Sequence, residues 1–199
     1  MIERRTVSVE MRASEGRTIS GYAAVFNQLS ENLRWFREKI ALGAFAESLA
    51  SGANIFAFWN HNSDLPLGST RAKTLELFED ERGLGFELRL GQNQWDTFAH
   101  ERVSDGTVQE MSFSFETKDA SWEIVDGQEI RTLHKVDLFE VSPVMFPAYR
   151  QTSVEARAVE EIWQKHLAES GAAGTREEPG LDVSLALAIN NARQRRIRA

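Results

Sequence analysis

The chain contains no cysteine among its 199 residues. This absence excludes disulfide bonds, thiolate metal ligands and a cysteine nucleophile, and it is compatible with a reducing compartment. Basic residues are in the minority, with 23 Lys and Arg against 30 Asp and Glu, and the formal net charge is −7. Because such a charge repels polyphosphates at long range, we expect no general binding to nucleic acid. Any covalent nucleophile must be an oxygen or a lysine nitrogen.

Long hydrophobic runs are also lacking. No window approaches the roughly 18 continuous apolar residues of a membrane span, and the N-terminus MIERRTVSVEMRASEGR has charges every few residues and no apolar core of a signal peptide. The sequence therefore predicts a soluble protein with no membrane partner. Its four histidines, at positions 61, 100, 134 and 166, form no close pair of the kind that binds zinc, and no phosphate-binding glycine loop is present. We expect neither a metal nor a cofactor.

Short alternating runs dominate the first 150 residues. They have the period of two that is typical of strands and are separated by Gly, Asp and Asn turns. Two of these turns, EDERGLG (79–85) and VDGQE (125–129), are expected to be hairpin connections. Two helical patterns interrupt them, at residues 42–52 and 93–106. The composition predicts one sizeable core in a β-rich α+β domain, a barrel or a sandwich of about seven strands. The seven runs are 5–13, 18–26, 54–60, 74–80, 83–90, 111–125 and 129–146.

The texture of the sequence changes near residue 150. The stretch SVEARAVEEIWQKHLAES, residues 153–170, has charged residues and apolar residues at helical intervals. It is followed by GAAGTREEPG, residues 171–180, which has the Gly, Pro and charge content of a flexible linker. The basic end, with Arg193, Arg195, Arg196 and Arg198, is either a solvated tail or a docking segment for an acidic or helical partner.

One histidine stands at the end of an apolar run. His61 follows Ile55-Phe56-Ala57-Phe58-Trp59 and precedes a polar turn. Its simplest role is to hydrogen-bond that turn and cap a strand. Its alternative role is that of a general base, which needs a hydroxyl within about 2.6–3.2 Å and a third group that orients the ring.

Two serines share one face of a strand. In GTVQEMSFSFE, residues 106–116, Ser112 and Ser114 alternate with Met111, Phe113 and Phe115. If the large apolar residues enter the core, the serine face points outward or into a cleft, where a reacting hydroxyl must be. The alternative is that both serines are only the solvent side of an amphipathic strand.

The third group of such a site would come from HKVDLFEVSPVMFPAY, residues 134–149. Strict alternation places one set of side chains on one face of that strand: His134, Val136, Leu138, Glu140 and Ser142. A carboxylate among apolar neighbours is costly unless it is paired, so Glu140 belongs either to a site or to an ion pair with an arginine such as Arg71 or Arg131.

Several blocks occur in an order that resembles the prohead maturation proteases of tailed bacteriophages, which are similar to the herpesvirus assemblins. The resemblance covers about residues 18–157. It rests on GYAAVFN (21–27), ALGAFAESL (41–49), FWNHNSDLPLGSTR (58–71), LEL and DERGLGFELRL (75–90), VSDGTVQEMSFSF (103–115) and LFEVSPVMFPAYRQTSVEAR (138–157).

The resemblance implies a serine endopeptidase on a closed β-barrel flanked by short helices. Together with the composition, this gives a protease domain at residues 1–157, a C-terminal helix at 158–170, and a flexible linker and basic tail at 171–199. The resemblance implies that Ser112 is the nucleophile and His61 the base. For the third member it favours Glu140, with His134 as a rival because assemblins use a second histidine. A carboxylate stabilises the imidazolium better than a neutral ring does.

The same resemblance implies a substrate. This is the scaffolding region of the major capsid protein, or a separate scaffold, inside an immature shell in the host cytoplasm. It also implies cleavage of the protease itself and allows self-association. Two alternatives are a non-catalytic capsid scaffold or binding module with the same barrel, and a different serine hydrolase such as an esterase. The esterase is disfavoured because no G-x-S-x-G motif is present.

Overall fold

The computed structural model describes residues 1–8, 11–145 and 153–171. Contacts within the chain divide it into two units, Met1–Gln164 and Lys165–Ala199, and the architecture below is that of the first unit. The basic tail and most of the predicted linker lie outside the described residues.

Ten strands and three helices make up the described residues. In chain order they are β1 (Glu3–Ser8), β2 (Arg12–Ala13), β3 (Thr18–Val25), β4 (Phe36–Ile40), α1 (Ala46–Ala50), β5 (Phe56–Trp59), β6 (Asn62–Ser69), β7 (Leu75–Glu79), β8 (Gly83–Arg89), α2 (Gln94–Ser104), β9 (Glu110–Val125), β10 (Gln128–Val144) and α3 (Ser153–Ser170).

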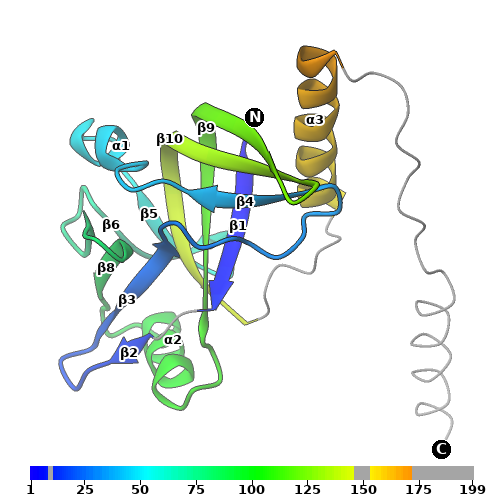
Figure 1. The fold of residues 1–199 in the computed structure, drawn as a ribbon. Coiled ribbons are helices and arrows are strands. Elements are labelled where there is room, and N and C mark those ends of the chain that lie inside the picture. Colours follow the sequence, from blue (N-terminus) through cyan, green and yellow to red (C-terminus); the bar gives the residue numbers. More distant parts are fainter. Residues whose placement is uncertain (9–10, 146–152, 172–199) are drawn as a thin grey trace, which may run out of the picture. The chain divides into compact units, whose positions relative to one another are not determined.

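The larger sheet is built around one long hairpin, β9–β10, which Figure 1 shows with β1 beside β9. Its strand order is β1-β9-β10-β5-β6, and β4 also pairs with β10. The sheet is mixed, because β4 and β5 both run parallel to β10 while the other pairs are antiparallel. The smaller sheet is antiparallel, with the order β2-β3-β8-β7.

The predicted closed barrel is wrong. Closure requires the two edge strands of a sheet to pair with each other, but in the described residues β1 pairs only with β9, and β6 pairs only with β5. The second edge of β10 is shared between β4, at residues 129–133, and β5, at residues 140–141. The sheet therefore branches at β10, and the protein has two separate sheets instead of one closed one.

The two predicted hairpin turns form. Asp80 joins β7 to β8 by accepting hydrogen bonds from the backbone N–H groups of Arg82 and Gly83 at 2.7 and 3.0 Å. Asp126 and Gly127 join β9 to β10 with φ values of 51° and 77°, the left-handed conformation that an Asp-Gly pair adopts in a two-residue hairpin.

Of the predicted helices, α2 begins closest to its predicted start. Helix α2 is capped by Asn93, whose side chain accepts from the backbone N–H groups of Trp95 and Asp96 at 2.8 and 2.9 Å. Helix α1 is shorter than the predicted 42–52. In the region of the predicted C-terminal helix lies α3, and its Trp163 stacks on Trp35 with ring centroids 6.3 Å apart.

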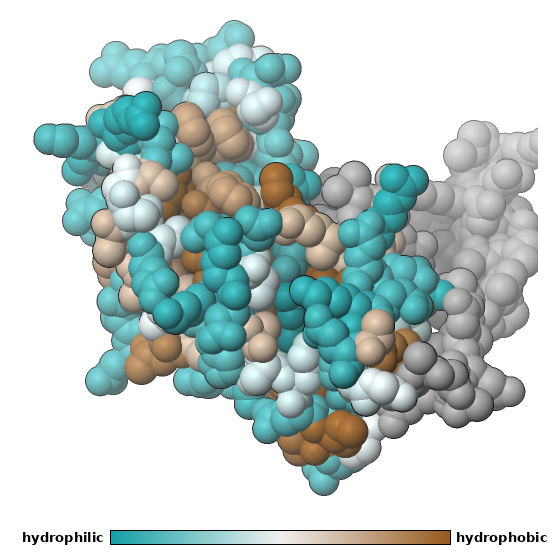
Figure 2. All heavy atoms as spheres, turned by 90° about the horizontal axis from the view of Figure 1, so that it is seen from above, coloured by the Kyte–Doolittle hydropathy of each residue, from teal (hydrophilic) through white to brown (hydrophobic). Residues whose placement is uncertain are grey.

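The core contains one face of the central hairpin. Met111, Phe113 and Phe115 are at most 1% exposed, as the alternation predicted. Figure 2 shows that hydrophobic residues on the face seen from above gather in separated patches among hydrophilic ones. None of the helices in the described ranges combines the length and apolar composition of a membrane span.

A buried charged cluster joins β1 to β4 and β10. We call Glu3, Arg5, Glu38 and Arg131 the structural ion cluster. Arg5 binds Glu38 at 2.7 Å and Glu3 at 3.0 Å. Arg131 binds Glu3 at 2.7 Å and Glu38 at 3.0 Å. Burial by itself raises the pKa of Glu3, but the hydrogen bond from Arg131 and the charge of Arg5 outweigh it, so that pKa is lowered. The N-terminal strand is thus fixed to the sheet by two fully paired guanidinium groups.

Candidate active site

His61 lies in a two-residue turn of the larger sheet. Trp59 and Asn62 are register partners, so Asn60 and His61 are the two central residues of the β5–β6 hairpin. Their φ values are 53° and 61°. Both central residues of a type I′ turn require positive φ, and glycine is preferred at the second. A side chain at this position costs about 1 kcal/mol of strain.

The turn directs the ring of His61 onto β10. The backbone N–H of Asn60 donates to the carbonyl of Pro143 at 3.0 Å, which ties the turn to the end of β10. From there the Nδ1 atom of His61 reaches Oε1 of Glu140 at 2.6 Å. Two predicted site residues, far apart in the sequence, are therefore in direct contact.

A β-bulge aims Glu140 at this contact. Leu138 pairs with Phe115 in the β9–β10 ladder, but Glu140 pairs with Ser114, so Phe139 is the extra residue of the bulge. The bulge reverses the alternation. Leu138 enters the core, whereas Glu140 projects from the opposite face together with the serines. The prediction that Leu138 and Glu140 share a face, which assumed strict alternation, is wrong for this reason.

The Glu140 carboxylate is almost fully occupied. It is 6% exposed, and it accepts hydrogen bonds from Ser114 Oγ to Oε1 and from Ser142 Oγ to Oε2, both at 2.5 Å, besides its contact with His61. Burial raises the pKa of Glu140, but the bond and charge of His61 and the two hydroxyl bonds outweigh burial, and the pKa is lowered. The group is therefore held as a carboxylate.

Arg4 completes the surroundings of this carboxylate. Its Nε atom donates to Ser114 Oγ at 3.1 Å, and its Nη2 atom lies 3.7 Å from Oε1 of Glu140. Arg4 and Ser114 are register partners across β1 and β9. The N-terminal strand thus brings a positive charge to the same face.

Ser112 occupies the neighbouring position on β9. It is 0% exposed, and its Oγ donates to the backbone carbonyl of Arg5 at 2.9 Å. Its register partners are Thr6 on β1 and Ser142 on β10. Neither serine of the predicted pair is a solvent-facing residue, so the alternative of a simple amphipathic strand is wrong.

The second ring nitrogen of His61 has a different environment. Because Nδ1 faces a carboxylate, it carries the ring proton in the neutral imidazole and leaves Nε2 as an acceptor. Nε2 is buried and has no hydrogen-bond partner among the residues that the structure describes. A buried acceptor without a partner is costly, and it is the feature that a general base presents to a nucleophile.

The sequence allowed Arg131 as an ion-pair partner of Glu140, and His134 as the third member of the site in place of Glu140. Arg131 binds Glu3 and Glu38 and is no partner of Glu140. His134 contacts Ser121 through Nε2 at 2.7 Å, in an exposed part of the β9–β10 hairpin. The described residues bring His61 and Glu140 together and leave His134 with Ser121. They contain no group of three His, Asp or Glu residues arranged to hold a metal ion.

Comparison with known families now gives the class of the protein. A family model described as caudovirus prohead serine protease matches residues 5–165. Because that match covers most of the 199 residues, the chain belongs to this family. It is a serine protease of capsid maturation in tailed bacteriophages, and it acts on capsid protein within the procapsid. Neither the curated proteins nor the solved structures contain a match to the chain.

Some contacts of the site were missed by sequence reasoning. Ser142 was expected on the face of Glu140, but its hydrogen bond to the carboxylate was not. Ser114 was considered only as a rival nucleophile, and Arg4 was not considered. No sequence signal indicates Arg4, because its position depends on the pairing of β1 with β9, more than 100 residues away.

Proposed function

We propose that the protein is a serine endopeptidase that uses Ser112, His61 and Glu140 as nucleophile, base and orienting carboxylate. Its substrate is the scaffolding region of the major capsid protein, or a separate scaffold, within immature shells in the host cytoplasm. It then cleaves its own chain. The observation that supports this best is the His61–Glu140 contact of 2.6 Å beside a buried, unpartnered Nε2.

The choice of Ser112 over Ser114 rests on the register of β9 and β10 next to His61. The turn that holds His61 is tied to Pro143, the register partner of Met111, while the ring reaches Glu140, the partner of Ser114. Ser112 stands between these two levels. The hydroxyl of Ser114 is already donated to Glu140, whereas within the described ranges that of Ser112 donates to a backbone carbonyl, that of Arg5.

The reaction follows from these roles. The Ser112 hydroxyl turns from the Arg5 carbonyl to Nε2 of His61, which takes its proton as Oγ bonds to the scissile carbonyl carbon. Glu140 stabilises the imidazolium that forms. The imidazolium gives its proton to the leaving amine as the peptide C–N bond breaks. Water, deprotonated by His61, then hydrolyses the acyl-enzyme and releases Ser112.

The test is co-expression with the cognate major capsid protein. Wild type, Ser112→Ala and Ser114→Ala are compared, and the capsid protein and the protease are both weighed by intact-mass spectrometry. We expect truncation with wild type, no truncation with Ser112→Ala, and reduced truncation with Ser114→Ala.

Two results would count against the proposal. Truncation that survives Ser112→Ala but not Ser114→Ala would exchange the nucleophile. Shells that contain wild-type protein but intact capsid protein would favour the non-catalytic scaffold. In the same spectra, an uncut protease in mature particles would refute self-cleavage, for which the linker at 171–180 is the proposed position.

A further inference from the structure

Two solvent-exposed phenylalanines and a third, partly buried one lie at the Glu140 end of the site. Phe56 on β5 is 37% exposed and Phe139 on β10 is 40% exposed. The partly buried Phe58 stacks on Phe56 with ring centroids 5.3 Å apart and an angle of 10°. Single exposed apolar residues are common, but a contiguous group of exposed aromatic residues is typical of a binding surface. We call Phe56, Phe58 and Phe139 the aromatic surface.

The aromatic surface is continuous with the face of β9 that carries Ser112 and Ser114. Phe56 is the register partner of Glu140 across β10 and β5, and Glu140 is the partner of Ser114 across β10 and β9. Partners on neighbouring strands project from one face and lie about 5 Å apart. Phe139 is the bulged residue next to Glu140. A peptide bound at Ser112 and extending towards β5 along this face would meet these rings.

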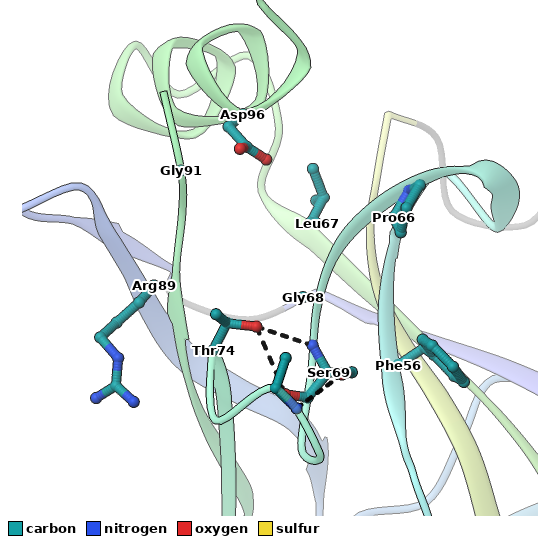
Figure 3. Close-up of a pocket in the computed structure, with 10 residues that line it drawn as sticks. Phe56, Pro66, Leu67, Gly68, Ser69, Thr74, Arg89, Gly91 and Asp96 are labelled. Atoms are coloured by element: carbon teal, nitrogen blue, oxygen red, sulfur yellow. Dashed lines mark hydrogen bonds between the residues drawn. The ribbon is translucent and has the colours of Figure 1, made fainter. Parts of the chain in front are cut away.

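A cavity of about 360 Å³ is lined by Phe56 and lies between β6, the end of β8 and α2 (Figure 3). Its apolar lining includes Phe56, Pro66, Leu67 and Ala72. Such a volume accommodates a large side chain.

The polar groups of this cavity already have partners. The backbone N–H of Ser69 donates to Thr74 Oγ1 at 3.0 Å, and Arg89 donates to the carbonyl of Lys73. The Asp96 carboxylate accepts from Asn93 at 2.7 Å. Each of these groups makes at least one hydrogen bond within the protein, and the remaining lining of the cavity is largely apolar.

We propose that the aromatic surface and this cavity bind a large apolar side chain of the substrate, within a few residues of the scissile peptide. The inference rests on the proposed function and adds to it the class of residue that the protease recognises. Phe56 is the central residue, because it lines the cavity and is also paired with Glu140.

The test uses a phenylalanine of matched exposure as control. Phe78 is 41% exposed and lies on β7 in the other sheet. For Phe56→Ser we expect the KM for capsid protein to rise by about tenfold with kcat retained, the usual effect of one apolar contact in substrate recognition. Phe78→Ser should behave as wild type. Hydrolysis of p-nitrophenyl acetate, which reaches Ser112 without a peptide, should be unchanged in Phe78→Ser.

A second comparison uses the substrate. Cleavage sites are mapped by mass spectrometry, and large apolar residues near them are replaced by serine. Wild type should lose about tenfold in kcat/KM on the replaced substrate, whereas Phe56→Ser should lose little more than it has already lost.

The outcomes separate this inference from the proposed function. An unchanged KM in Phe56→Ser, an equal rise in Phe78→Ser, or additive losses in the substrate comparison would overturn the inference alone. Failure of wild type to cleave any capsid protein would overturn the proposed function, and the inference with it.

Discussion

The larger sheet buries two charged clusters that differ in one respect. In the structural ion cluster, two carboxylates and two guanidinium groups satisfy one another, and all four side chains are at most 11% exposed. In the site, Glu140 has three close hydrogen-bond partners, namely His61, Ser114 and Ser142. The Nε2 atom of His61, in contrast, is buried and has no hydrogen-bond partner among the described residues. The two clusters use the same strands, β1 and β10, on opposite faces of the sheet.

This difference shows how one sheet separates stability from chemistry. A buried charge is tolerated when every partner is present, and such a cluster resists change. A nitrogen that is left unpaired costs free energy in the resting protein but is available for proton transfer. We therefore expect substitutions in the first cluster to change the free energy of unfolding, and those in the second to change the rate of proteolysis.

The largest expected effect on stability comes from Arg131→Met. This change leaves Glu3 and Glu38 with Arg5 alone, so a negative charge stays buried without compensation. We expect the free energy of unfolding to fall by about 3–5 kcal/mol, measured by urea denaturation, with activity per folded molecule retained. Lys39→Met, which removes the exposed pair between Lys39 and Glu123, is the control and should cost less than about 1 kcal/mol. Equal losses in the two variants would contradict the comparison.

The next effect is a dependence of stability on pH. The pKa of Glu140 is lowered from its ordinary value of 4.5. Its contribution to stability is therefore complete above pH 4.5 and is lost as the pH falls through the lower, folded-state pKa. The variant Glu140→Gln should show a shallower decline of the unfolding free energy below pH 4.5, by at most about 1.4 kcal/mol per pH unit, the value for one proton. Urea titrations at several pH values measure this slope, and identical slopes would disprove the assignment.

The smallest effect concerns the strain at His61. Replacement by alanine and by glycine both remove the imidazole, so both variants should be inactive. Because φ is 61° at this position, the glycine variant should be more stable than the alanine variant by about 1 kcal/mol. Thermal denaturation of the two variants measures the difference. A more stable alanine variant would mean that the turn is not strained.

The predictable parts of this fold are those with strong local signals. The Asp126-Gly127 turn, the helix predicted at 93–106 and the alternation around Phe113 each depend on neighbouring residues, and each was found. Strands β4 and β6 were missed because FREKI and NSDLPLGS are charged or polar and carry no apolar alternation. The barrel was predicted wrongly because strand counts do not say that β4 and β5 share one edge of β10.

The site was predictable only in part, for a similar reason. Family resemblance suggested His61, Ser112 and Glu140, whereas the residues alone left several alternatives. The bulge at Phe139 could not be predicted, since it depends on how β10 pairs with β9. Without it, Glu140 would face the core with Leu138.

The pairing of β1 with β9 also bears on when the enzyme can become active. The hydroxyl of Ser112 contacts a carbonyl 107 positions away in the chain, and Arg4 contacts Ser114 across 110 positions. Contacts of such high sequence separation carry a large loop-closure entropy and form late in folding. The chain must therefore be synthesised through β10 before β1 can close over the hairpin. A nascent or truncated chain lacks a completed site, and topology alone delays proteolysis until the domain has folded.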